Sequence, residues 1–214
     1  MPRANRIFIP GMIWHITHRC HKKEFLLKFA RDRRRWLRWL FEAKKRYNLI
    51  ILNYVVTSNH IHLLVLDEEK DAIASAIQLA AGRTAQEYNK RKKRKGAFWE
   101  DRYHATAIQT GEYLQRCLVY IDLNMIKAGV VDHPSQWGEG GYCELQNPVE
   151  RYRIIDRKKL FTLLGFESDE EFQEAHRYWV NDALKNPQSR WETPFSQNIA
   201  VGSVEFVNSV AQKL

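Results

Sequence analysis

The stretch LIILNYVVTSNHIHLLVL, Leu49 to Leu66, contains two apolar runs separated by the short polar link Thr57-Ser58-Asn59. Short runs rich in β-branched residues are typical of strands, and a short polar link between two of them indicates a hairpin. The second run begins with two histidines, His60 and His62. Because residues i and i+2 of a strand face the same side, both imidazoles are predicted to project from one face of this hairpin.

Strands and helices alternate around the hairpin. One strand is predicted from Met12 to Arg19, where β-branched and aromatic residues mix with polar ones, and another from about Tyr103 to Gln109. Helices are predicted over three ranges: Ala30 to Tyr47, Asp71 to Lys90, and Gly111 to Lys127. The order strand, helix, strand, strand, helix, strand, helix predicts an α+β domain of the ferredoxin-like type, an antiparallel sheet with helices packed on it.

The composition of the sequence changes after Val131, where HPSQWGEGGY is rich in turn-forming residues. The dipeptide Asn147-Pro148 marks a predicted boundary between a domain of residues 1–146 and a C-terminal extension of residues 147–214. The extension is predicted to be a small helical tail, and its role stays open. Ser168 is the predicted N-cap of a helix from about Asp169 to Leu184, with Glu171 as its capping-box partner.

The positive charge of the chain is concentrated in its first half. Residues 1–110 contain 23 Lys and Arg against 10 Asp and Glu, whereas residues 111–214 contain 11 against 15. Lysine and arginine gain free energy by displacing counterions from phosphates, so this imbalance favours a nucleic acid or another polyanion as partner. A basic protein that is merely well solvated is the alternative.

The chain has no feature of a membrane or secreted protein. No stretch reaches the roughly 18 uncharged apolar residues of a membrane span, and MPRANRIFIP lacks the apolar core of a signal peptide. The three cysteines Cys20, Cys117 and Cys143 form no C-x-x-C pair, so they encode neither a disulfide framework nor a thiolate zinc site. These features predict a cytoplasmic protein without a membrane partner.

The predicted helix from Gly111 to Lys127 carries a polar stripe. At 100° per residue, five residues lie within about 40° of one direction: Tyr113, Arg116, Tyr120, Asn124 and Lys127. Apolar residues flank the stripe on both sides, so it is predicted to face a cleft, whereas Asp122 and Gln115 are predicted to face solvent. Tyr120 and Asn124 are one turn apart, so the phenol and the amide can approach one point. A buried tyrosine hydrogen-bonded to an asparagine explains that spacing equally well.

Two histidines on one strand face can share a cation, or they can simply form hydrogen bonds with the backbone. In a basic domain, a hard cation would serve to polarise a phosphodiester, and such chemistry needs a third ligand and a nucleophile. The helix with Tyr120 and Asn124 offers a candidate for each.

In this order, SNHIHLLV and VYIDLNMIKAGVV resemble the motifs of the single-tyrosine HUH transposases, and most closely those of the REP-associated tyrosine transposases. WHITHR and AQEYNKRKKRKGAFWEDRYHA support the resemblance, which covers Arg6 to Tyr142. It implies that His60, His62 and Asn124 bind a divalent ion, Mg²⁺ or Mn²⁺, and that Tyr120 is the catalytic nucleophile. Many relatives have Asn-Pro where this chain has Asn124-Met125, which leaves the ligand turn less rigid.

The resemblance also implies an activity and a partner. Tyr120 would cleave DNA through a 5′-phosphotyrosine link and leave a free 3′-hydroxyl, which can rejoin DNA during transposition or recombination without a nucleotide cofactor. The expected partner is single-stranded or hairpin DNA, such as a REP element, and the expected state is a monomer or a homodimer. Two alternatives stay open: a domesticated hairpin-DNA-binding protein without turnover, and another HUH endonuclease such as a relaxase or replication initiator.

The candidate DNA contacts combine positive charge with aromatic rings, a mixture that follows a phosphate backbone and stacks on bases. They are Arg83, Tyr88, Arg91, Lys92, Lys93, Arg94, Lys95, Arg102, Arg116 and Lys127. Trp99 is explained equally well as a core residue or as a stacking platform. A second candidate surface is the basic helix with Arg31, Arg33, Arg34 and Arg35. Because tyrosine has an ordinary pKa of about 10, we expect Lys127 or Arg116 to help lower the pKa of Tyr120.

Overall fold

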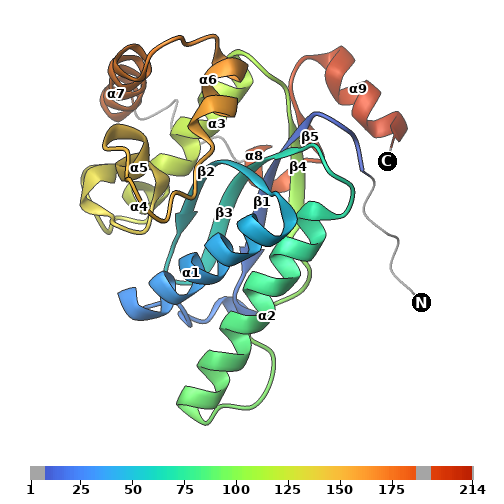
Figure 1. The fold of residues 1–214 in the computed structure, drawn as a ribbon, viewed down its shortest axis with the longest axis vertical. Coiled ribbons are helices and arrows are strands. Elements are labelled where there is room, and N and C mark those ends of the chain that lie inside the picture. The colour runs from blue at the N-terminus through green and yellow to red at the C-terminus, as the bar shows by residue number, and fades with distance from the viewer. Residues whose placement is uncertain (1–7, 187–193, 214) are drawn as a thin grey trace.

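The computed structural model describes residues 8–186 and 194–213, and within them the core of the protein is a five-stranded sheet. The strand order is β2-β3-β1-β4-β5 (Figure 1). The strands are β1 (Met12–Arg19), β2 (Ile50–Val56), β3 (His60–Asp67), β4 (His104–Ile108) and β5 (Ala200–Val201). The first four strands pair antiparallel, as the ferredoxin-like order predicts. The predicted α+β class and the hairpin of β2 and β3 are therefore confirmed.

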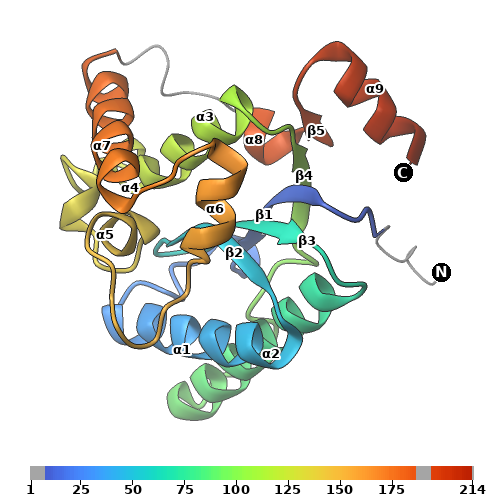
Figure 2. The ribbon, with the colours of Figure 1, turned by 45° about the horizontal axis from the view of Figure 1, so that its top comes forward.

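Helices cover both faces of the sheet (Figure 2). On one face lie α1 (Ala30–Tyr47) and α2 (Ala72–Lys92), and on the other lies α3 (Glu112–Asp122), which is followed by the short α4 (Asn124–Lys127). The apolar stripe of α1 buries Trp36, Leu40 and Ala43, while most of its basic residues, Arg33 excepted, stay at least partly exposed. The face of the sheet under α3 is the one that carries the candidate site.

The helices that follow α4 pack beside α3 and the sheet (Figure 2). Short segments η1 (His21–Lys23) and η2 (Pro134–Gln136) connect larger elements, and the remaining helices are α5 (Gly141–Gln146), α6 (Arg157–Leu164), α7 (Asp169–Lys185), α8 (Pro194–Gln197) and α9 (Val204–Lys213). As predicted, the Ser168 hydroxyl caps α7 by accepting a hydrogen bond of 3.1 Å from the Glu171 amide. Among the helices described, none is long and apolar enough to cross a bilayer.

Strand β5 was not predicted, and it makes the tail part of the sheet. It runs parallel to β4, with hydrogen bonds from the Ala107 amide to the Ile199 carbonyl (2.8 Å) and from the Gln109 amide to the Val201 carbonyl (3.0 Å). A two-residue strand has no detectable alternation, so periodicity cannot predict it. Its pairing brings α8 against the face of the sheet that lies under α3 (Figure 2).

The predicted continuous helix from Gly111 to Lys127 is interrupted. Leu123 has ψ of 2°, which ends α3 and lets α4 begin at Asn124. The prediction that Asp122 faces solvent is wrong, because its exposed fraction is 6%. Helix α7 covers this side of α3, where Val180 packs with Val119 and Leu123.

The buried Asp122 carboxylate is the centre of a hydrogen-bond network. Its Oδ2 accepts a bond of 2.7 Å from His176 Nε2 on α7, and its Oδ1 accepts one of 3.0 Å from Asn53 Nδ2 on β2. Gln146 Nε2 donates to His176 Nδ1 over 2.9 Å, so Nδ1 accepts while Nε2 donates to Asp122. The network therefore joins the tail, the sheet and the end of α3 two residues after Tyr120.

Asp122→Ala is expected to destabilise the protein by about 3 kcal/mol or more, since it leaves buried donors on His176 and Asn53 without an acceptor. Urea denaturation followed by circular dichroism measures this loss. The control is Asp182→Ala on the exposed side of α7, which should change the free energy of unfolding by less than about 0.5 kcal/mol. Equal stabilities of the two variants would contradict the structural role of the network.

Candidate active site

A pocket of about 440 Å³ lies between the sheet and α3. The register pairs Thr17 of β1 with His62 of β3 and Arg19 with His60, so side chains of both strands share this face. From the other side, α3 and α4 contribute Tyr120, Asn124 and Lys127 to the lining. The pocket thus collects polar residues from segments far apart in the sequence.

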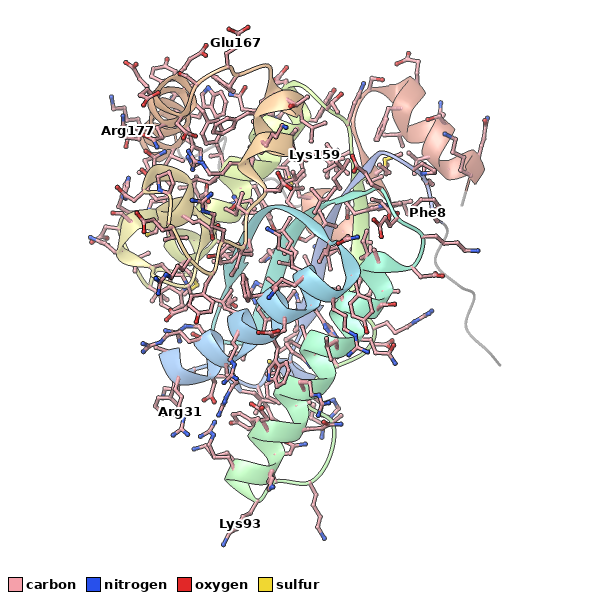
Figure 3. All side chains as sticks on the ribbon, in the orientation of Figure 1. Phe8, Arg31, Lys93, Lys159, Glu167 and Arg177 are labelled. Carbon is pink, nitrogen blue, oxygen red and sulfur yellow. The ribbon has the colours of Figure 1, made fainter. Side chains whose placement is uncertain are left out.

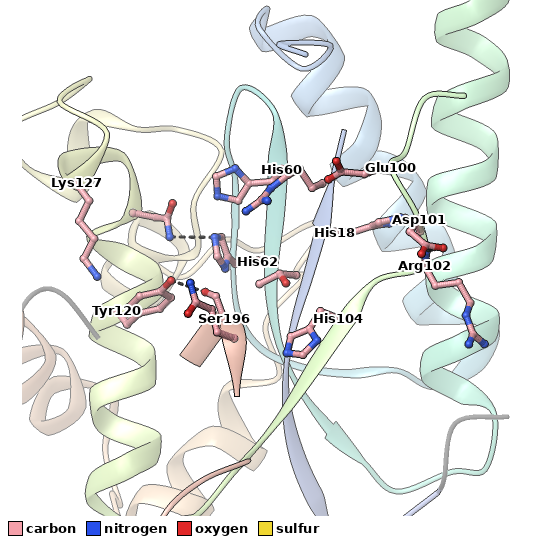
Figure 4. A pocket seen from close by; sticks show the side chains of 14 residues that line it. His18, His60, His62, Glu100, Asp101, Arg102, His104, Tyr120, Lys127 and Ser196 are labelled. Carbon is pink, nitrogen blue, oxygen red and sulfur yellow. Dashed lines mark hydrogen bonds between the residues drawn. The ribbon is translucent and has the colours of Figure 1, made fainter. Parts of the chain in front are cut away.

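The four residues expected to carry the chemistry meet in this pocket (Figure 4). The ring centroids of His60 and His62 are 4.8 Å apart, and those of His62 and Tyr120 are 5.9 Å apart. Asn124 Nδ2 lies 3.0 Å from His62 Nε2. The structure therefore brings the strand-borne imidazole pair and the helix-borne phenol and amide to one place.

His60 is held in one tautomer by the residue before it. Its Nδ1 donates a hydrogen bond of 2.7 Å to Asn59 Oδ1. The Asn59 amide is oriented in turn, because its Nδ2 donates to the Lys23 carbonyl over 3.2 Å. With the proton on Nδ1, the lone pair of His60 is on Nε2.

Both histidines are electrically neutral near pH 7. Burial and the charge of Arg19 lower the pKa of His60 from 6.5 to about 4. Burial, together with the neighbouring His60 and His15, lowers the pKa of His62 well below its ordinary value. Nitrogen lone pairs are therefore available without competition from protons.

These donors fit a hard or borderline divalent ion such as Mg²⁺ or Mn²⁺. The described residues contain no cluster of three His, Cys, Asp or Glu able to hold a metal, so the set is two imidazoles and the Asn124 amide. Asn124 presents its nitrogen to His62, and a half-turn of the amide plane would present its oxygen instead. Such a set leaves positions for phosphate oxygens and water.

Tyr120 lies in a partly buried, cationic environment. Its hydroxyl is 2.5 Å from the hydroxyl of Ser196 on α8, and Lys127 Nζ is 3.8 Å from its ring centroid. Burial raises the pKa of Tyr120 above 10, while the hydrogen bond with Ser196 and the charge of Arg19 oppose that rise. Figure 4 shows Lys127 directed towards Tyr120. The pKa of Tyr120 is nevertheless raised and not lowered as expected, because the effect of burial exceeds the opposing effects.

Arg116, the other cation expected beside Tyr120, is placed elsewhere. Its side chain is exposed and turns back along α3, where Nη1 lies 3.8 Å from the Glu112 carboxylate. It does not line the pocket. The prediction that Arg116 faces the cleft is wrong, since a long side chain on the edge of a polar stripe can extend to the solvent.

Several lining residues were missed by the sequence reasoning: Thr17, His18, Arg19, Glu100, Asp101, His104, Ser196 and Gln197. A signal existed for β1, because His15, Thr17 and Arg19 alternate with apolar or aromatic-stacked residues and so share one face. No signal existed for Ser196, which is 76 residues from Tyr120. Only packing of the tail brings it there.

The other DNA-contact candidates lie along α2 and the loop that follows. Helix α2 extends past the sheet, and Lys93 lies at one end of the molecule (Figure 3). Some of these candidates contact aromatic rings of the chain: Arg83 lies over Trp39, Tyr88 against Phe98 and Lys92 over Phe29. Two others form polar contacts: Arg91 pairs with Asp32, and Arg94 donates to the Ala97 carbonyl. Lys93 and Lys95 are exposed, and Arg102 lines the pocket.

Two further candidates for DNA contact, Trp99 and Arg33, form contacts within the fold instead. The Trp99 ring stacks on His18 with centroids 4.2 Å apart, and its indole nitrogen donates to the Ala81 carbonyl over 3.0 Å. Arg33 is 7% exposed and forms an ion pair of 3.0 Å with Glu139, so it is not part of a basic surface on α1.

Comparison with solved structures finds two matches that are described as transposases. A structure of a REP-associated tyrosine transposase bound to a REP hairpin has a TM-score of 0.53 and 17% identity, covering 73% of this chain and 94% of that one. A crystal structure of a candidate transposase from Deinococcus radiodurans has a TM-score of 0.40 and 12% identity, covering 60% and 97%. The first of these likenesses supports the fold. No curated protein matches the sequence significantly.

The sequence itself identifies the family. The model of the IS200-like transposases matches residues 9–124, which is just over half of the 214 residues. The matched segment begins before β1 and ends at Asn124, so it contains the histidine pair and Tyr120. The chain belongs to the family of IS200-like transposases.

Proposed function

We propose that this protein is a metal-dependent DNA transposase of the REP-associated type, which cleaves and rejoins single-stranded or hairpin DNA through a tyrosine. The observation that carries the proposal is the 5.9 Å between the ring centroids of His62 and Tyr120, in a pocket that Lys127 and Asn124 also line. A phenol, neutral imidazoles and a cation in one pocket suit attack on a phosphodiester.

The proposed reaction needs no nucleotide cofactor. The Tyr120 oxygen attacks the scissile phosphorus, the phosphorus–O3′ bond breaks, and the 3′-oxygen takes up a proton to leave as a hydroxyl. The 5′-phosphate stays on Tyr120, and a 3′-hydroxyl can attack that phosphate to release the tyrosine. A divalent ion held by His60, His62 and Asn124 would polarise a non-bridging phosphate oxygen.

The residues of the chain have separate tasks in this proposal. Lys127, 3.8 Å from the Tyr120 ring, stabilises the tyrosinate. Arg19 lies at the end of β1 in the pocket, where its charge opposes the rise that burial causes in the pKa of Tyr120, and it can bind a non-bridging oxygen. Ser196 is the hydrogen-bond partner of the phenol before DNA binds.

Hairpin DNA is the proposed partner. The REP-associated tyrosine transposase of similar fold was solved with a REP hairpin. In this chain, exposed lysines such as Lys93 and Lys95 at the end of α2 would bind phosphates, and Arg102 connects that region to the pocket.

The test is a covalent-adduct assay. Purified protein is incubated with end-labelled hairpin DNA that has single-stranded flanks, with Mn²⁺ or Mg²⁺, and analysed on a denaturing gel. A labelled protein band that EDTA prevents is the expected result. Hairpin binding in a native gel without any adduct, over a range of hairpins and flanks, would favour the DNA-binding alternative.

Arg19→Ala is expected to lower the rate of cleavage by about 10- to 100-fold, because a charge-assisted contact to the phosphate is lost. Hairpin affinity should change much less, since in this proposal the exposed lysines at the end of α2 supply most of the phosphate contacts. Single-turnover cleavage at saturating protein measures the effect. Arg177→Ala, which removes an exposed arginine from α7, is the control, and equal rates for both variants would remove Arg19 from the mechanism.

A further inference from the structure

His15 is a fully buried histidine behind the metal-binding pair, and it has no task in the mechanism above. It lies on β1, two residues before Thr17, which pairs with His62 across the sheet. The exposed fractions of His15 and His62 are 0% and 3%. Their rings are parallel within 3°, with centroids 5.0 Å apart. The two rings are therefore nearly parallel, and a nitrogen of one lies within hydrogen-bond distance of a nitrogen of the other.

Each ring nitrogen of His15 has one hydrogen-bond partner, and these partners determine which nitrogen donates and which accepts. Its Nδ1 lies 2.6 Å from the carbonyl oxygen of Phe195, and a carbonyl oxygen can only accept. The proton of His15 is therefore on Nδ1. Its Nε2 lies 2.9 Å from His62 Nδ1. At the other end of the relay, the amide nitrogen Asn124 Nδ2 lies 3.0 Å from His62 Nε2 and can only donate, so the ring proton of His62 is on Nδ1 and is donated to His15 Nε2.

The same chain of bonds fixes the other nitrogen of His62. With its proton on Nδ1, the ring has its lone pair on Nε2, which is the nitrogen that faces Asn124 over 3.0 Å. Asn124 Nδ2 donates to that lone pair in the metal-free pocket. Reversing the relay would remove the proton from His15 Nδ1, so that its lone pair would face the Phe195 carbonyl oxygen over 2.6 Å, and it would put a proton on His62 Nε2, where it would block a metal.

From this geometry we infer that His15 is a positioning residue, which holds His62 in the Nδ1–H tautomer and so presents Nε2 as a ligand. The carbonyl of Phe195 holds His15 in turn, so the C-terminal segment supports the site from behind. The tautomer follows from the hydrogen bonds alone, whereas its use in metal binding rests on the proposed function. Hydrogen bonds behind a metal ligand usually contribute 10- to 100-fold to metal affinity.

The two histidines are oriented by unlike anchors. His60 is held by Asn59, the residue before it, at the half-exposed end of the hairpin. His62 is held through His15 by Phe195, which is 180 residues from His15 and fully buried. In both histidines, Nδ1–H donates a hydrogen bond to its partner, and the lone pair on Nε2 faces the pocket. The pair therefore needs the folded tail as well as the hairpin to present two lone pairs.

Two variants separate tautomer control from packing. His15→Gln can keep the relay, because its amide NH₂ can donate to Phe195 and its oxygen can accept from His62. His15→Phe fills the space but offers His62 no acceptor. A packing role predicts that Phe is tolerated at least as well as Gln, whereas the relay predicts the opposite order.

The direct measurement is the tautomer of His62 in the metal-free protein, read from long-range ¹H–¹⁵N correlations of the imidazole rings. Wild type and His15→Gln should show Nδ1–H, and His15→Phe should shift His62 towards Nε2–H. Mn²⁺ affinity, measured from the electron paramagnetic resonance of free Mn²⁺, should fall about 10- to 100-fold in His15→Phe and less than about 3-fold in His15→Gln.

An Nε2–H tautomer of His62 in the wild-type protein would overturn the inference, even if the variants do not fold. So would an unchanged tautomer in folded His15→Phe. If the tautomers behave as expected but none of the proteins binds Mn²⁺, the relay stands and the proposed metal-dependent function fails. The two ideas are thus tested separately.

Discussion

Tyr120→Phe is expected to abolish the covalent DNA adduct, a loss of about 10⁴-fold or more, because the ring stays in place while the attacking oxygen is gone. The phenol lines the pocket, and its ring centroid is 5.9 Å from that of His62. Hairpin binding should persist, since the substitution removes no charge. Quantifying the labelled band on a denaturing gel, with a native gel for binding, measures both effects.

Tyr113→Phe is the matched control for this substitution. Tyr113 lies on α3 two turns before Tyr120 and packs against the core, outside the pocket. It should form the adduct at the rate of the wild type. An adduct of undiminished yield in Tyr120→Phe would assign the nucleophile to another residue, and the proposed mechanism would have to be abandoned.

His62→Ala is expected to lower the affinity for Mn²⁺ by about 100-fold or more and to stop cleavage under conditions where the wild type is saturated. The reason is the loss of a neutral imidazole that is oriented from behind by His15 and faces Asn124. His60→Ala should have a similar effect. Titration followed by electron paramagnetic resonance of free Mn²⁺ measures the affinity, and the adduct assay measures the cleavage.

His133→Ala controls for nonspecific binding of Mn²⁺ to histidine. His133 caps the short segment η2 and lies outside the pocket. We expect its Mn²⁺ affinity to equal that of the wild type, with a small loss of stability from the missing cap. Wild-type Mn²⁺ affinity in a folded His62→Ala would show that the metal, if bound, is held elsewhere.

The sequence was sufficient for the local structure of the site. The alternation of HIHLLVL placed His60 and His62 on one strand face, and β3 begins at His60. The predicted strand from Met12 to Arg19 has the bounds found in the structure, and the hairpin predicted from Leu49 to Leu66 is found from Ile50 to Asp67, one residue different at each end. Tyr120 and Asn124 lie on adjacent turns as predicted, although the helix is interrupted between them. Periodicity of 2 or 3.6 residues determines which neighbours along the chain share a face, so these features are local.

Prediction failed for two residues of α3, one buried by a segment far along the chain and one whose long side chain bends away from the expected direction. Asp122 was expected to face solvent because α3 alone gives it no partner, and α7 covers it. Arg116 was expected in the cleft because the helical wheel treats a long side chain as a fixed direction, and it extends to Glu112 instead. A wheel contains no information about either effect.

The sequence by itself determined the strands, the helices and the face on which the two histidines and the tyrosine lie. Only the tertiary structure decided that Ser196 contacts the Tyr120 hydroxyl and that Phe195, through His15, orients His62. The physical reason is that backbone periodicity fixes the directions of side chains within one element. Contacts between elements depend on the packing of the tail against the sheet, for which a two-residue strand and one turn of helix leave no periodic pattern in the sequence.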